Sequence, residues 1–430
     1  MCMTSLTFPH PFETEQLPVE GVRLIVENII NQSPIISADP TNCTDTSFLH
    51  HTQVTRLLQL RLLSKAWDIV ILDSVFKNLR LPRDNMASSL AGIWKTSYLT
   101  PGFPKLQRLC LDGVQHPMPL SRHGQPLPSP TPVYPFSIRP QNAASIISLC
   151  RYTLTQLKLR FIDCVGFTPE LSNTIQLATG LHTLNISGSR SSGVPHDSKS
   201  IKFLLERIPQ LKSLSLNFSF LSAMELARNS LPDLEHFWFA CDLDNLQAAK
   251  DICQSSARKI SCLELLPQAN PDPIAPIALG LQDILQVLFI ISIPDRIPRD
   301  SRDTCFPKLR VLRSEYCHSN PLEIDLQWLK WPLLQSIEVL VTSYWHGNVY
   351  WRSILAQTDR ASITVPPKLK HIVFTTPEGS GLRDQELVEV FQSIGVKCHF
   401  MFQPACADLM GLANLLNTEE LRSNDVVDPN

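Results

Sequence analysis

A chain of 430 residues, of which 43% are hydrophobic, has enough apolar material for a large core and too much for a disordered protein. Its 38 basic and 40 acidic residues leave a net charge of -2, so it lacks the basic field that nucleic-acid binding needs. The first residues show no basic n-region and no long apolar h-region, and no run of roughly 18 apolar residues follows, so we expect an intracellular protein, cytoplasmic or nuclear, without membrane contact.

After an N-terminal extension (1–15), the first predicted element is an amphipathic helix that starts at Leu17-Pro18. Proline suits the first turn of a helix. The apolar side chains that follow recur at helical spacing and form one face: Val22, Ile25, Val26, Ile29 and Ile30. Residues 31–53 are polar and contain Pro34 and Pro40, which predicts an inserted loop.

A second helical stretch, from Val54 to about residue 81, is rich in leucine. It holds more apolar surface than a short helix can bury against one neighbour, so one face is expected to meet another protein or the next domain. The apolar positions are Leu57, Leu58, Leu60, Leu62, Leu63, Trp67, Val70 and Ile71.

The LP-x-E start and the run LLxLxLLSKAW resemble the F-box motif over residues 16–81. The inserted loop is longer than in a compact F-box, and the closing Leu-Trp pair is replaced by Val75-Phe76. The resemblance implies a helical module that binds a Skp-family adaptor and, through it, cullin and RING subunits. The adaptor-binding residues that it implies are Leu17, Pro18, Glu20, Ile25, Leu57, Leu58, Leu62, Leu63 and Trp67. The alternative is that residues 16–81 only cap the end of a repeat array.

Residues 100–402 repeat one short phrase, with apolar residues at its first, fourth and sixth positions. The phrases begin at 106, 154, 181, 211, 234, 260, 285, 309, 334 and 369, and eight of the nine intervals measure 23–35 residues. The long first interval contains an insertion, 115–140, with eight prolines. The spacing predicts an α/β fold in which a leucine-rich-repeat solenoid, a horseshoe with parallel strands on its concave face, follows the helical module. The array resembles the irregular repeats of fungal F-box proteins.

Side chains between the phrase leucines are expected to face the concave surface. The fifth positions form a central column: Cys110, Lys158, Asn185, Ser215, Trp238, Glu264, Phe289, Arg313, Glu338 and Val373. Aromatic and charged groups are typical anchors of interfaces. The predicted substrate contacts are therefore Lys158, Arg160, Trp238, Phe289, Arg313 and Glu315, with Trp345 and Trp351 in an aromatic cluster after a strand. Ordinary packing of these aromatics is the alternative.

The array is expected to end in a helix over 385–393 and a strand over 396–402, followed by a polar tail, 403–430. No phosphate loop, hydrolase motif or regular Cys/His spacing appears, so we expect no catalytic residue, no cofactor and no metal site. The twelve scattered cysteines are interpreted mostly as buried hydrophobes. The sequence thus favours a non-catalytic substrate-recognition subunit of an SCF-type ubiquitin ligase, with an unknown protein as substrate. A leucine-rich-repeat interaction scaffold is the alternative.

Overall fold

A computed structural model of the chain describes residues 17–96, 105–115, 137–162, 165–188, 195–241, 243–254, 258–267, 275–318, 326–357, 364–376 and 384–424. The predicted extension 1–15 and residues 116–136 of the Pro-rich insertion lie outside these ranges. Among the described residues, no helix is both long enough and apolar enough to cross a membrane.

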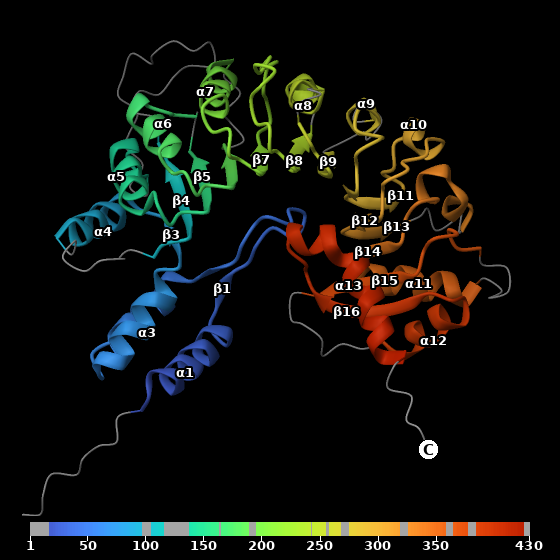
Figure 1. The fold of residues 1–430 in the computed structure, drawn as a ribbon, viewed down its shortest axis with the longest axis horizontal. Coiled ribbons are helices and arrows are strands. Elements are labelled where there is room, and N and C mark those ends of the chain that lie inside the picture. The colour runs from blue at the N-terminus through green and yellow to red at the C-terminus, as the bar shows by residue number, and fades with distance from the viewer. Residues whose placement is uncertain are drawn as a thin grey trace, which may run out of the picture.

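The fold is mixed α/β, and its main element is a sheet in which the chain adds twelve described strands in sequence order, each parallel to its neighbour. The sheet curves into an open arc, with the strands along its inner side (Figure 1). The strands are β3 (Asn78–Leu81), β4 (Arg108–Val114), β5 (Gln156–Phe161), β6 (Thr183–Ser187), β7 (Ser213–Asn217), β8 (His236–Cys241), β9 (Cys262–Pro267), β10 (Val287–Ile290), β12 (Val311–Ser314), β14 (Val339–Ser343), β15 (His371–Thr376) and β16 (Lys397–Phe402). A separate parallel pair joins β11 (Ser292–Pro294) and β13 (Tyr316–His318).

Helices cover the outer side of the arc (Figure 1), because strands added in one direction and joined by right-handed crossovers carry their connections on the same face of the sheet. They are α4 (Asp84–Thr96), α5 (Pro140–Cys150), α6 (Pro169–Gln176), α7 (Pro195–Leu205), α8 (Leu246–Cys253), α9 (Ala275–Leu279) and α10 (Arg299–Arg302), with α11 (Tyr344–Gln357) and α12 (Gln385–Ser393) beside the last strands. Short 3-10 turns are η1 (Leu243–Asn245), η3 (Leu326–Lys330) and η4 (Pro332–Leu334).

The fourth position of the repeated phrase sets the strand register. Leu157 pairs with Leu109 and Leu184, and Leu263 pairs with Phe237 and Leu288. These side chains point into the core between the sheet and the outer helices, where all six are at most 2% exposed. Burial of the phrase leucines therefore stacks one repeat on the next.

The phrase predicted to begin at residue 334 begins three residues later in the structure, so its predicted register is wrong. Pro332–Leu334 form the turn η4, and Val341, not Glu338, pairs with Arg313 in the central column. Leu333 and Leu334 are buried in the core before the strand starts, so they imitate the apolar start of a phrase.

Two predicted boundaries also differ from the structure. The sheet starts at β3, inside the range assigned to the helical module, because Leu79 and Leu81 pair with β4 and are buried. The predicted polar tail contains a helix, α13 (Cys406–Asn424), which lies on the inner side of the arc.

The N-terminal module consists of α1 (Val19–Asn31), α2 (His51–Leu60) and α3 (Lys65–Val75), and it extends away from the arc (Figure 1). Its own small core holds Val22, Val26, Leu57, Val70, Ile71 and Val75. The predicted loop between α1 and α2 contains a short antiparallel pair, β1 (Ile35–Ile36) and β2 (Phe48–Leu49).

Candidate functional site

The N-terminal module leaves large apolar side chains in solvent. Leu62 is 82% exposed, Leu24 68% and Leu63 63%, and Leu17 and Ile25 are exposed as well. Leu24 and Ile25 lie on α1, Leu17 lies just before α1, and Leu62 and Leu63 lie in the turn between α2 and α3. Five exposed aliphatic side chains in one small module are more than isolated surface leucines, and such groups mark interaction sites. We call Leu17, Leu24, Ile25, Leu62 and Leu63 the apolar surface of the module.

The adaptor-binding residues predicted from the motif divide into two groups. Leu17, Pro18, Glu20, Ile25, Leu62 and Leu63 are exposed, as direct contacts must be. Leu57 is only 1% exposed and lies in the core of the module, so the prediction that Leu57 contacts the adaptor directly is wrong. Leu58 and Trp67 are half-buried and pack against the same core. This position indicates that Trp67 stabilises the module more than it meets a partner.

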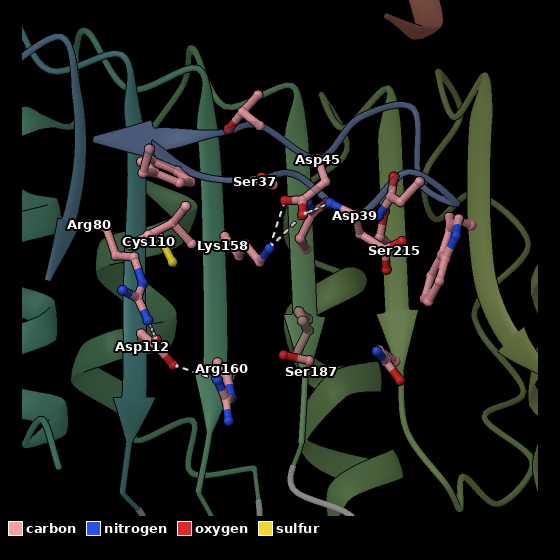
Figure 2. Close-up of a pocket in the computed structure, with 18 of the residues that line it drawn as sticks. Ser37, Asp39, Asp45, Arg80, Cys110, Asp112, Lys158, Arg160, Ser187 and Ser215 are labelled. Atoms are coloured by element: carbon pink, nitrogen blue, oxygen red, sulfur yellow. Dashed lines mark hydrogen bonds and ion pairs between the residues drawn. The ribbon is translucent and has the colours of Figure 1, made fainter. Parts of the chain in front are cut away.

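The loop between α1 and α2 does not project into solvent. Residues 37–47, which we call the crossing segment, run along the inner face of the sheet to the start of α13 (Figure 1). Near β5, the Lys158 ammonium lies 2.7 Å from an oxygen of Asp45 (Figure 2), and Gln156 Nε2 donates to the Thr44 carbonyl at 2.7 Å. Asp45 is almost fully buried, so this ion pair is shielded from solvent screening on one side.

Further along the sheet, the crossing segment offers its backbone carbonyls to strand side chains. Trp238 Nε1 donates to the Thr41 carbonyl at 3.1 Å, and Arg313 donates to the Pro40 carbonyl. Gln403, after β16, donates to the same Pro40 carbonyl at 3.0 Å. The segment is therefore tied to strands from both halves of the arc.

These contacts cover much of the surface predicted to bind a substrate. Trp238, Phe289 and Arg313 are at most 3% exposed. The prediction that these side chains contact a substrate directly is therefore wrong in this arrangement. A partner could reach them only by displacing the crossing segment. Glu315 is half-buried, and burial raises the pKa of its carboxyl group. The positive charge of Arg313 opposes this rise in pKa in part. Arg160 is exposed and available.

The aromatic cluster predicted near Trp351 is mainly packing. Trp351 is 3% exposed and its ring lies edge-on to Phe391, with ring centroids 5.1 Å apart. Trp345, in contrast, is 53% exposed. Of the two predicted tryptophan contacts, only Trp345 can meet a partner directly.

Glu264 is the centre of a buried polar network under the crossing segment. Its side chain is fully buried and is paired with the Arg313 guanidinium. Its other oxygen accepts from the Cys43 backbone N–H at 2.9 Å and lies 2.9 Å from His236 Nε2. Arg313 also stacks over the Phe289 ring, 4.7 Å from its centroid. A buried carboxylate with this many partners fixes the crossing segment in one position.

Beside Glu264, four residues with metal-binding atoms converge from distant parts of the chain. One ligand atom from each of Cys43, His236, Cys262 and Cys406 lies within 4.8 Å of the others. Hydrogen bonds from the Cys262 and Cys43 thiols lower the pKa of Cys406, whereas burial raises that of Cys43. The sequence predicts no metal site, whereas these four side chains have a geometry that could hold an ion.

The sequence contained part of the signal for this cluster. His236 and Cys262 both occupy the third position of their phrase and are paired neighbours on adjacent strands. The third-position column faces the same inner side of the sheet as the central column. Nothing in the local sequence places Cys43 or Cys406 beside them.

Valines of the third-position and fifth-position columns together pack against α13. Leu409, Leu412, Ala413 and Leu416 of α13 are buried against a cluster that includes Val287, Val311, Val339, Val341 and Val373. Helix α13 thus covers the inner face of the C-terminal half of the arc, as the crossing segment covers the N-terminal half.

A polar cavity of about 350 Å³ remains between the crossing segment and strands β3–β8. Asp112 bridges Arg80 and Arg160 on its floor (Figure 2), with 3.2 Å between Asp112 and Arg160. Asn185 also lines the cavity, and both polar atoms of its buried side chain lack a hydrogen-bond partner. A ligand that offers both a donor and an acceptor would satisfy this amide.

Comparison with models of known protein families gives no match for this chain, and comparison with curated protein sequences gives no significant match either. Function is therefore inferred from the residues and geometry of the chain itself.

Proposed function

We propose that this protein is the substrate-recognition subunit of an SCF-type ubiquitin ligase. In this proposal, the N-terminal module is an F-box that binds a Skp-family adaptor, and the curved array is a leucine-rich-repeat solenoid that carries the target protein. The observation that supports it most is the apolar surface of the module, which coincides with residues of the F-box-like motif.

The position of this surface suits an adaptor. The module has its own core, so Leu17, Leu62 and Leu63 are not needed to hold the three helices together. The module also projects from the arc, which leaves room for a second protein beside α1 and α3 (Figure 1). Burial of these leucines against an adaptor would explain why they are exposed although they do not stabilise the free protein.

The solenoid assignment is supported by the strand order and register. Each repeat adds one parallel strand, and the phrase leucines of successive repeats are paired. Such arrays present extended surfaces to partners. In the arrangement seen here the exposed candidates for target contact are Arg160 and Trp345, whereas Trp238, Phe289 and Arg313 require the crossing segment to move.

The proposed contribution of this protein to ubiquitin transfer is positional. Cullin and RING subunits, joined through the adaptor, would bring the charged conjugating enzyme near lysines of the bound target. The resulting rise in effective concentration speeds a reaction without any catalytic side chain from this chain.

Co-purification of the full chain with a Skp-family adaptor tests the proposal. Leu62→Asp and Leu63→Asp should each abolish co-purification, because a carboxylate would be placed in a desolvated apolar contact. Leu177→Asp is the matched control, since Leu177 is a 55% exposed leucine beside α6, in the curved array. Failure of the wild-type chain to bind the adaptor, or equal binding by all three variants, would favour the interaction scaffold with a helical cap.

A further inference from the structure

We propose that Cys43, His236, Cys262 and Cys406 form a structural zinc site that fastens the crossing segment and α13 to the inner face of the sheet. This inference does not rest on the proposed function. It would hold equally for an interaction scaffold.

The geometry of the four side chains fits a tetrahedral ion. Because Zn–S bonds measure about 2.3 Å and Zn–N bonds about 2.0–2.1 Å, neighbouring ligand atoms of a tetrahedral site lie about 3.5–3.8 Å apart. Cys43 Sγ and His236 Nε2 are 3.6 Å apart, and all four ligand atoms lie within 4.8 Å of one another. Three cysteines and one histidine are a ligand set typical of structural zinc.

The surroundings of His236 are those of a metal ligand. Its second ring nitrogen, Nδ1, lies 2.8 Å from Ser213 Oγ, a hydrogen bond that fixes the ring with Nε2 toward the cysteines. Glu264 also lies near Nε2, but it keeps Arg313 and the Cys43 N–H as partners when Nε2 binds an ion.

Each ligand comes from a different structural unit. His236 and Cys262 are the first residues of β8 and β9, which form a rigid base on adjacent strands. Cys43 belongs to the crossing segment, and Cys406 is the first residue of α13. One ion would therefore join two covering segments to the sheet, and without it three thiols would crowd around a buried imidazole. Removal of the ion should loosen both covers together.

Metal analysis of the purified full chain tests this site. The wild-type protein, purified with zinc and then dialysed against metal-free buffer, should retain one zinc per chain by native mass spectrometry. Cys406→Ser should bind zinc at least about 100-fold more weakly, because loss of even an outer partner of a zinc ligand costs about 10–100-fold. Cys398→Ser is the matched control, since Cys398 is also a half-buried cysteine, lies on β16 and is outside the cluster.

A second measurement uses only the wild-type chain, so that misfolding of a variant cannot decide the result. Treatment with a chelator should increase maleimide labelling of Cys43, Cys262 and Cys406, while Cys110 and Cys317, which are buried elsewhere, stay unlabelled. Zinc loss should also speed proteolysis within residues 37–47. A wild-type chain that retains no zinc, a disulfide between two of the three cysteines in its place, or equal zinc retention by both serine variants would overturn the proposal.

Discussion

Replacement of Arg313 by alanine is expected to be among the most destabilising single changes on the inner face. The side chain is 3% exposed and has three partners at once: Glu264, the Pro40 carbonyl and the Phe289 ring. Arg313→Ala would leave the fully buried Glu264 without its arginine partner. Breaking a buried ion pair by removing one member costs about 3–5 kcal/mol, because the remaining charge stays desolvated.

Arg160→Ala provides the comparison. The Arg160 guanidinium also pairs with a carboxylate, Asp112, but its side chain is 63% exposed. An exposed ion pair contributes about 0.2–1 kcal/mol. Both variants can be measured by urea denaturation followed by tryptophan fluorescence and circular dichroism, since coincident transitions justify a two-state free energy. A loss below about 1 kcal/mol for Arg313→Ala, equal to that of Arg160→Ala, would show that the Arg313 guanidinium is solvated and that the crossing segment is not seated on it.

Two further predictions concern other buried groups. Burial raises the pKa of Asp197 to about 6, and although one oxygen accepts from the Val165 N–H at 2.9 Å, the other has no partner. The folded state therefore binds more protons than the unfolded state between about pH 4 and 6, so stability falls as the pH rises through this window. Asp197→Asn should remove that slope and raise the free energy of unfolding above pH 7 by about 3 kcal/mol, whereas an unchanged pH profile would mean that the carboxylate is hydrated. In α13, Leu412→Ala should cost about 2–5 kcal/mol because Leu412 is buried against the valines of the inner face, while Leu415→Ala, at a 51% exposed position of the same helix, should leave the melting temperature unchanged. Equal melting temperatures for these two variants would show that α13 does not pack on the sheet.

The sheet could be predicted from sequence because its signal is local and repeated. Each phrase carries one apolar position just before the strand and two within it, and the burial of these side chains fixes which strand residues face the core, as Leu157 and Leu263 show. The register failed only where Leu333 and Leu334 placed buried apolar residues directly before a strand. A packed 3-10 turn and the start of a strand have similar composition there.

The sequence did not predict the crossing segment or α13 on the inner face, for two different reasons. The crossing segment has no apolar period, and its position depends on polar contacts such as Asp45 with Lys158 and Asn42 with Ser215, which join residues far apart in the chain. Local patterns do not contain such contacts. Helix α13, in contrast, had a readable signal, because Leu409, Leu412 and Leu416 recur at helical spacing. The polar residues at the end of the chain obscured it.

This difference also explains the outcome for the candidate site. Arg313 and Trp238 were identified as notable residues of the central column, and the structure does place them on the inner face. Their partners, however, belong to the same chain. A strand pattern predicts which side chains share a face, but it does not predict what covers that face.

Hydrogen–deuterium exchange of the full chain, measured with and without a Skp-family adaptor, tests the central proposal most directly. If the N-terminal module is an F-box, the adaptor should slow exchange over α1 and from the end of α2 into α3, where Leu62 and Leu63 lie, and leave β4–β16 unchanged. Slowed exchange along the inner face of the sheet with none in the module, or no change anywhere at saturating adaptor, would contradict the proposal that this protein is a ubiquitin-ligase subunit.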